Sequence, residues 1–126
     1  MDKKRIFVAE DDKGYGKIYK VRLEREGFEV SVIDQGDQVV SEVVKQHPDL
    51  LILDLMLPKK SGFEILEELR SKKETKDLKV IIASNLSQEI DKEKVEKLGV
   101  LDYFIKSDIS IADLMAKVKG FVGDTV

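Results

Sequence analysis

The 126-residue sequence contains no cysteine and only one histidine. The absence of cysteine excludes a disulfide framework, thiolate chemistry and any zinc site with sulfur ligands. The single histidine, His47, lies beside Pro48 at the end of a predicted helix, which disfavours a histidine metal site. The apolar segment near the N-terminus is too short for a signal peptide, and no apolar run reaches membrane-spanning length. The sequence therefore predicts a soluble cytoplasmic protein.

The charge balance of the chain gives no sign of a nucleic-acid-binding surface. The chain has 22 basic and 25 acidic residues, a formal net charge of −3, so no basic surplus marks a nucleic-acid surface. With 42% hydrophobic residues, the chain is long enough for one compact core and too short for two ordinary domains. We expect a single domain over 1–126 without an output domain, no direct nucleic-acid contact and no membrane contact.

Five short apolar runs alternate with helical patterns along the chain. The runs cover 6–9, 30–33, 50–53, 80–83 and 103–105, and most are continuous, as in parallel strands buried on both faces. Apolar residues at helical spacing fill the stretches around 13–26, 39–44, 62–72, 87–99 and 111–122. In the first of these, Tyr15, Ile18, Tyr19 and Leu23 are assigned to one side. Right-handed crossovers then predict an α/β fold with a doubly wound, five-stranded parallel sheet and helices on both faces.

Polar residues follow four of the five apolar runs at the point where each run ends. Because the carboxyl ends of parallel strands meet at one edge of a sheet, we expect these side chains to converge. They are Glu10, Asp11 and Asp12 after the first run, Asp54 after the third, Ser84 after the fourth and Lys106 after the fifth.

The convergent residues indicate phosphoryl chemistry. Neighbouring carboxylates repel one another unless a proton or a cation neutralises them, and oxygen ligands without histidine or cysteine suit Mg2+. Lys106 and Ser84 supply the positive charge and the hydroxyl donor that a phosphoryl group needs. A carboxylate can itself attack phosphorus, which makes Asp54 the expected nucleophile.

Each residue also has a plainer interpretation. The three consecutive acids could favour a helix N-terminus, although this explains one acid better than three. Asp54 could cap the next segment or pair with a lysine, and Ser84 and Lys106 taken singly are ordinary residues. Gly14 and Gly16 do not form a phosphate loop, because the flanking acids repel phosphate. The combination of residues favours the functional interpretation.

The segments "RIFVAEDD", "PDLLILDLMLPKKSG", "VIIAS" and "YFIK", in this order and spacing, resemble the receiver domain of bacterial two-component response regulators. The resemblance covers essentially the whole chain. It implies a flavodoxin-like sheet with strand order 2-1-3-4-5. It further implies that Asp54 accepts a phosphoryl group from the phosphohistidine of a sensor histidine kinase or phosphotransfer protein.

The resemblance also implies roles for individual residues. Asp11 would bind Mg2+ directly, Glu10 through water, and the Met56 main-chain carbonyl would be a further ligand. Ser84 would be the switch hydroxyl and Lys106 the phosphate-binding lysine. The role of Tyr103, an aromatic that turns inward on activation, rests on the resemblance alone, since an aromatic in a strand is more often core. Pro58 and Gly62 match the loop after the phosphorylation site.

Two positions depart from the family pattern. Receivers usually follow the lysine with a proline in a cis peptide, whereas Ser107 follows Lys106 here, and a cis bond before a non-proline residue costs about 2.5–4 kcal/mol. The sequence leaves open whether this peptide is cis, or trans with Lys106 slightly displaced. The family prefers a very small residue after the switch hydroxyl, but this chain has Asn85. The Asn85 side chain could either crowd the phosphoryl pocket or form a hydrogen bond into it.

The leading hypothesis is a stand-alone receiver that signals through an unknown downstream protein partner. It would promote its own phosphorylation and slow dephosphorylation without being a turnover enzyme. A phosphorylation-independent protein-interaction module is the alternative, supported by Asn85 and Ser107. A flavin carrier would need a Ser/Thr/Gly-rich loop after the first strand, and an aspartyl phosphatase a second acid at Met56. The sequence fits neither enzyme.

Overall fold

The computed structural model describes residues 3–85 and 92–123. Five parallel strands form one sheet in the order β2-β1-β3-β4-β5. The strands are β1 Arg5–Ala9, β2 Glu29–Ile33, β3 Leu50–Leu53, β4 Val80–Ser84 and β5 Asp102–Ile105. Each one matches a predicted apolar run to within one residue, and the order is the one that the resemblance implies. The predicted fold class is confirmed.

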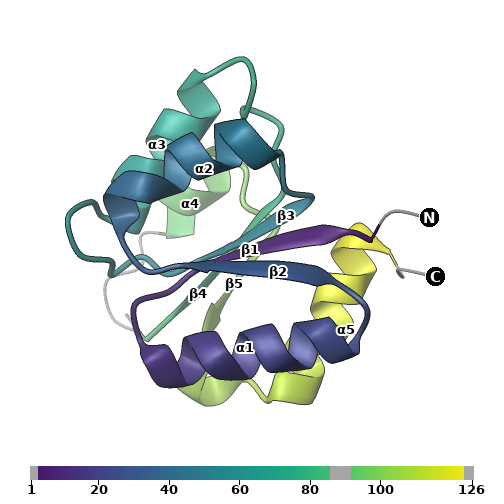
Figure 1. Cartoon of the computed structure of the whole chain (residues 1–126). Coiled ribbons are helices and arrows are strands. Elements are labelled where there is room, and N and C mark those ends of the chain that lie inside the picture. The colour runs from purple at the N-terminus through teal and green to yellow at the C-terminus, as the bar shows by residue number, and fades with distance from the viewer. Residues whose placement is uncertain (1–2, 86–91, 124–126) are drawn as a thin grey trace.

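The helices cover both faces of the sheet (Figure 1). Helices α1 Lys13–Arg25 and α5 Ile111–Val122 lie on one face, and α2 Val39–Gln46, α3 Gly62–Ser71 and α4 Lys92–Lys97 on the other. Two short 3-10 helices, η1 Gly36–Gln38 and η2 Lys106–Asp108, precede α2 and α5. Residues 87–91 of the predicted fourth helix, including Ile90, lie outside the described residues. Within the described ranges, no helix has the length and apolarity needed to cross a bilayer.

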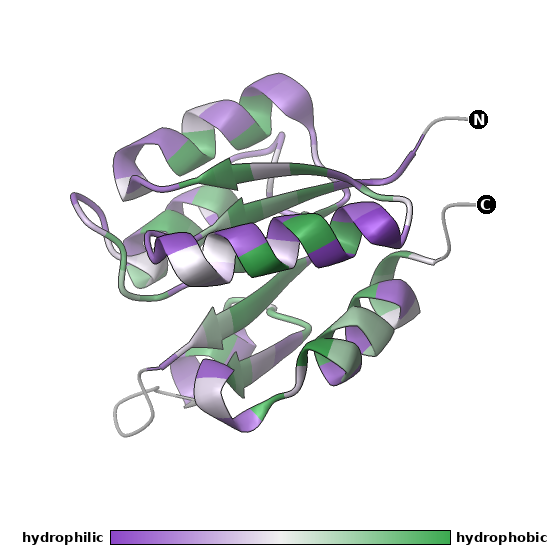
Figure 2. Cartoon of the chain, turned by 60° about the horizontal axis from the view of Figure 1, so that its bottom comes forward, coloured by the Kyte–Doolittle hydropathy of each residue, from purple (hydrophilic) through white to green (hydrophobic). Residues whose placement is uncertain are grey.

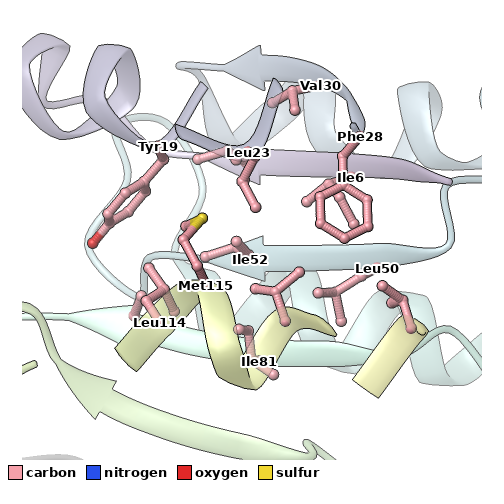
Figure 3. Packing of buried hydrophobic residues seen from close by; sticks show 14 residues of the cluster. Ile6, Tyr19, Leu23, Phe28, Val30, Leu50, Ile52, Ile81, Leu114 and Met115 are labelled. Atoms are coloured by element: carbon pink, nitrogen blue, oxygen red, sulfur yellow. The ribbon is translucent and has the colours of Figure 1, made fainter. Parts of the chain in front are cut away.

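The sheet separates two hydrophobic cores. Successive residues of a strand point to opposite faces, so Ile6 and Val8 enter the core under α1 and α5, whereas Phe7 and Ala9 enter the core under α2 and α3. Figure 3 shows the first of these cores, where Tyr19 and Leu23 of α1 face Leu114 and Met115 of α5. Because both faces are covered, every strand residue of β3 and β4 is buried.

Helix α1 corrects one detail of the predicted pattern. Tyr19 and Leu23 are buried, but Ile18, which we assigned to the same side, is 46% exposed. Residues four apart stack on one face of a helix, whereas Ile18 precedes Tyr19 by one residue and lies about 100° around the axis. The apolar stripe of α1 is therefore narrower than the sequence pattern suggested, and Figure 2 shows hydrophobic and hydrophilic residues interleaved along the helices.

Gly62, the first residue of α3, permits a close approach between the helix and the segment after β3. Its N–H donates to the Leu55 carbonyl at 2.9 Å. A Cβ atom at Gly62 would lie 2.6 Å from the Leu55 Cα and 2.7 Å from the Asp54 carbonyl oxygen. Both are main-chain atoms, so they cannot move aside as a flexible side chain could.

We expect Gly62→Ala to lower the free energy of unfolding by about 1–3 kcal/mol or more, because the backbone must shift to admit the methyl group. The matched control is Gly120→Ala, within α5, where a Cβ atom meets nothing within 4 Å. That substitution is expected to stabilise by about 0.5–1 kcal/mol through helix propensity. Urea unfolding followed by circular dichroism measures both, and equal effects at the two sites would contradict this account.

Candidate functional site

The site lies at the edge of the sheet where the parallel strands end. Glu10 follows β1 and Asp54 follows β3, and each continues the ladder by one hydrogen bond, from Glu10 N–H to the Ile33 carbonyl and from Asp54 N–H to the Ala9 carbonyl, both at 3.0 Å. Ser84 is the last residue of β4, and Lys106 directly follows β5. The strand ends therefore bring together residues that are far apart in sequence.

The three consecutive acids after β1 have different surroundings. Asp12 is the N-cap of α1, and its Oδ1 accepts from the Tyr15 N–H at 3.0 Å. Glu10 is 3% exposed, and its Oε2 accepts from the Asp12 N–H at 3.0 Å. Asp11 lies between them and is exposed. The helix N-terminus thus accounts for one acid and leaves Glu10 and Asp11 at the strand edge.

Asp54 is buried, with 5% of its surface exposed, and each of its oxygens has a partner. Oδ2 accepts from Lys106 Nζ at 2.8 Å. Oδ1 accepts from Ser84 Oγ and from the Met56 N–H, both at 2.9 Å. An ionised carboxylate tolerates burial only when it is compensated in this way. These contacts explain how an acid can end an otherwise apolar run.

Lys106 links the two buried acids. Its ammonium forms ion pairs with both Asp54 and Glu10, and its side chain is only 4% exposed. It also lies over the ring of Tyr15, 4.6 Å from the ring centroid. Burial alone lowers the pKa of Lys106, but the hydrogen bonds and charges of Asp54 and Glu10 outweigh burial, so the pKa is raised. Lys106 is therefore a fixed positive charge.

The cluster nevertheless has excess negative charge. When ionised, Glu10, Asp11 and Asp54 contribute three negative charges and Lys106 one positive charge, which leaves a net charge of −2. Burial raises the pKa of Glu10, and the neighbouring Asp54 adds to the rise, while hydrogen bonds from Lys106 and the Asp12 N–H only partly oppose it. The local field favours a bound divalent cation.

The donor set fits such a cation. One carboxylate oxygen from each of Glu10, Asp11 and Asp54 lies within 4.8 Å of the others. Opposite ligands of an octahedral Mg2+ are about 4.2 Å apart, so oxygens this close together suit one coordination sphere, directly or through a water. All donors are oxygen, as a hard ion requires.

Other predicted residues stand further from this cluster or contribute only main-chain atoms. The Met56 side chain is 59% exposed, and it is the Met56 N–H that contacts Asp54. Tyr103 is half-buried on β5 and packs against the core under α2 and α3. The structure places both residues without testing the ligand role of the Met56 carbonyl or the switch role of Tyr103, so these roles stay predictions.

The two departures from the family pattern contact each other. The Lys106–Ser107 peptide is trans, as all described peptide bonds are. The Ser107 N–H donates to Asn85 Oδ1 at 3.2 Å. The Asn85 side-chain oxygen therefore accepts a hydrogen bond from the 3-10 helix η2, which answers in part the question that the sequence left open.

Sequence reasoning missed two features. It assigned Tyr15 only to the buried side of a helix, although a ring one turn into the helix after the acids is well placed to meet a lysine at the same edge. It also gave no sign of a hollow of about 390 Å³ lined by Arg70, Leu78 and Leu101, among other residues. That hollow adjoins the starts of β4 and β5, at the opposite edge from Asp54, and it is not part of the site.

The family model described as the response regulator receiver domain matches residues 6–119. The phosphate regulon transcriptional regulatory protein PhoB of Rhizobium meliloti is 37% identical over 118 residues, which are 94% of this chain and 52% of PhoB. The chain thus spans about half the length of this curated relative.

Solved structures agree in fold. The BeF3-activated N-terminal receiver domain of RstA from Klebsiella pneumoniae is 25% identical with a TM-score of 0.84, over 94% of this chain and 98% of that one. The receiver domain of a sensor histidine kinase from Pseudomonas aeruginosa PAO1, with a magnesium ion in its active site cleft, is 22% identical with a TM-score of 0.85, over 98% of this chain and 100% of that one. The second similarity concerns the fold alone.

Proposed function

This chain belongs to the response regulator receiver domain family, and on that premise we propose that Asp54 accepts a phosphoryl group from a phosphohistidine in a Mg2+-dependent reaction. The observation that carries the proposal is the convergence at one sheet edge. Asp54 contacts Lys106 and Ser84, and it lies beside Glu10 and Asp11. This arrangement offers a nucleophile, a cation site and two groups that complement phosphoryl oxygens.

The reaction is an in-line displacement at phosphorus. A carboxylate oxygen of Asp54 forms a bond to phosphorus as the phosphorus–nitrogen bond of the phosphohistidine breaks, and the electron pair leaves with the imidazole. The chain's task is positioning and charge neutralisation, because the transition state is loose. Lys106 and Ser84, already within hydrogen-bond distance of Asp54, are placed to contact the oxygens of the transferred group.

Glu10, Asp11 and Asp54 would hold Mg2+, with the Met56 carbonyl as a further ligand. When bound, the ion supplies positive charge that offsets the −2 of the cluster and the charge of the incoming phosphoryl group. Asp11 is the exposed member of the set, so an ion can reach it from solvent. The support for this assignment is the all-oxygen donor set and its excess charge.

We expect Asp11→Asn to separate cation binding from folding. In wild type, Mg2+ at 100 times its dissociation constant is expected to raise the free energy of unfolding by about 2.7 kcal/mol. Asp11→Asn should lose most of this gain, because a ligand is missing. Without Mg2+ the variant should be more stable than wild type, because one like charge is removed.

Thermal unfolding with and without Mg2+ measures both effects. Asp12→Asn is the matched control, since an asparagine at the N-cap retains the capping oxygen. It is expected to keep the wild-type response to Mg2+. An equal Mg2+ response in Asp11→Asn and wild type would contradict the assigned ligand.

Phosphorylation acts as a switch in this proposal. The added charge, about −1.5 to −2, draws Ser84 and Lys106 toward the phosphoryl group, and the Tyr103 strand responds to that movement. The signal passes onward through contacts with a protein partner, and the donor is a sensor histidine kinase or a phosphotransfer protein. The chain promotes its own phosphorylation and slow dephosphorylation, and it does not turn over an external substrate.

Incubation with a small phosphodonor and Mg2+ tests the proposal. The intact mass of the wild-type chain should rise by one phosphoryl group, and a parallel sample with a chelator should show little or no adduct. An unmodified mass in the presence of both donor and Mg2+, with the fold intact by circular dichroism, would reject the proposal in favour of a phosphorylation-independent interaction module.

A further inference from the structure

Three hydrogen bonds close a ring around the mouth of the site. Ser84 Oγ donates to Asp54 Oδ1 at 2.9 Å, and Lys106 Nζ donates to Asp54 Oδ2 at 2.8 Å. The residues next in the chain, Asn85 and Ser107, are joined by the hydrogen bond from the Ser107 N–H to Asn85 Oδ1 at 3.2 Å. Beyond the β4–β5 ladder, which pairs Ser84 with Ile105, the segments that carry Ser84 and Lys106 are thus connected both through Asp54 and through their chain neighbours.

The second connection depends on a side-chain acceptor at position 85 and on the absence of proline at position 107. The donor is a main-chain N–H, which any residue except proline provides at position 107. The acceptor is a side-chain oxygen, which an alanine or leucine at position 85 would not provide. Both residues are exposed, so the hydrogen bond is not needed to satisfy a buried group. This hydrogen bond therefore contributes little to folding stability. A role in the site explains the presence of asparagine at position 85 better than a role in folding does.

The bond matters most when Asp54 carries a phosphoryl group. Ser84 and Lys106 must then give up their contacts with the carboxylate and move to the phosphoryl oxygens. Without the hydrogen bond between Asn85 and Ser107, the chain beyond the end of the β4–β5 ladder, at Ser84 and Ile105, loses its conformational freedom separately on each strand. With the connection, fixing one segment also restricts the other, so part of that entropy is already lost before phosphorylation.

We propose that Asn85 is a positioning residue, which couples Ser84 to Lys106 through the Ser107 N–H so that both contact a phosphoryl group on Asp54 together. The inference rests on the proposed function and deepens it. Among the described residues, the Asn85 side chain forms its hydrogen bond with Ser107 and none with Glu10, Asp11 or Asp54, so it acts on phosphoryl recognition and leaves cation binding unchanged.

The test compares two affinities in Asn85→Leu, which keeps the branched four-atom shape of the asparagine side chain and removes the acceptor. Beryllofluoride binding in saturating Mg2+, followed by 19F NMR, is expected to weaken by about 3- to 10-fold, the effect of losing one net hydrogen bond. Mg2+ affinity without beryllofluoride is expected to match wild type. A purely structural change would move both affinities and would overturn the proposal, as would beryllofluoride binding by Asn85→Leu equal to that of wild type.

Ser107→Ala is the matched control, because it keeps the main-chain N–H and should bind beryllofluoride like wild type. A double-mutant cycle completes the test. In a Ser107→Pro background the donor is absent, so the further change Asn85→Leu should have almost no effect. A full effect of Asn85→Leu in that background would overturn the coupling.

The failure of this inference is distinguishable from failure of the proposed function. If wild type binds beryllofluoride and Asn85→Leu binds it equally well, the coupling is wrong and the phosphoacceptor role stands. If wild type binds Mg2+ but no beryllofluoride and forms no phosphoryl adduct, the proposed function is overturned and the inference with it.

Discussion

Asp54→Asn is expected to abolish the phosphoryl adduct completely while leaving the fold intact. An amide lacks the anionic oxygen that attacks phosphorus, so no residual reaction at this position is expected. The asparagine Oδ1 can still accept from Ser84 Oγ and the Met56 N–H, the two donors that Asp54 Oδ1 has. Lys106 retains Glu10 as a partner, so the buried ammonium is not left unpaired.

Intact-mass measurement after incubation with a phosphodonor and Mg2+ detects the loss. The control is Asp34→Asn: Asp34 follows β2 at the same edge of the sheet and is exposed, and it does not belong to the acid cluster. This variant should form the adduct like wild type. An adduct that survives Asp54→Asn and disappears in Asp34→Asn would show that the nucleophile has been misassigned.

Lys106→Met is expected to lower the free energy of unfolding by about 3–5 kcal/mol without Mg2+. Removing one member of a buried ion pair leaves the other uncompensated, and Lys106 compensates both Glu10 and Asp54. Methionine keeps an unbranched chain of similar length, so the loss of charge dominates over the loss of packing.

The same substitution at Lys117 is the control. Lys117 pairs with Asp102 at 3.2 Å and lies over Phe104, but its side chain is 44% exposed, so about 0–1 kcal/mol is expected.

The deficit of Lys106→Met should depend on pH and on Mg2+. Burial already raises the pKa of Glu10, and without Lys106 that pKa should rise further. When a carboxyl has a higher pKa in the folded state than in the unfolded state, the free energy of unfolding falls as pH rises through the range between those two pKa values. The stability deficit of Lys106→Met should therefore be larger at about pH 8 than at about pH 5. Mg2+ should restore part of the stability. A deficit that grows toward acid pH would contradict the charge explanation.

The fold was predictable because its signals are local. Apolar runs of three or four residues, most of them continuous, identify strands covered on both faces, and each described strand matches such a run to within one residue. Once the strands are parallel, the residues that follow them must share one edge, so the meeting of Asp54, Ser84 and Lys106 follows from topology. No contact between these residues needed to be known in advance.

Other features were not predictable because they depend on helix rotation and loop geometry. Whether Ile18 faces the core is decided by an angle of about 100° per residue, which an apolar pattern resolves poorly. The position of the Tyr15 ring over Lys106 requires a helix and a loop that are distant in sequence. The contact between Asn85 and Ser107 arises from two residues that were separately identified as departures from the family pattern, and pairing them required the coordinates.

Every residue of the short segment between β1 and α1 is needed to connect the two elements. Glu10 still continues the sheet ladder and Asp12 already caps the helix, so Asp11 alone spans the junction. One inserted or deleted residue would therefore have to be absorbed by rotating α1 about 100° or by breaking its cap. Rotation would carry Tyr19 and Leu23 away from the hydrophobic interior, and loss of the cap would cost about 0.5–2 kcal/mol. Changes in the length of this junction should therefore be tolerated far less well than changes in its composition.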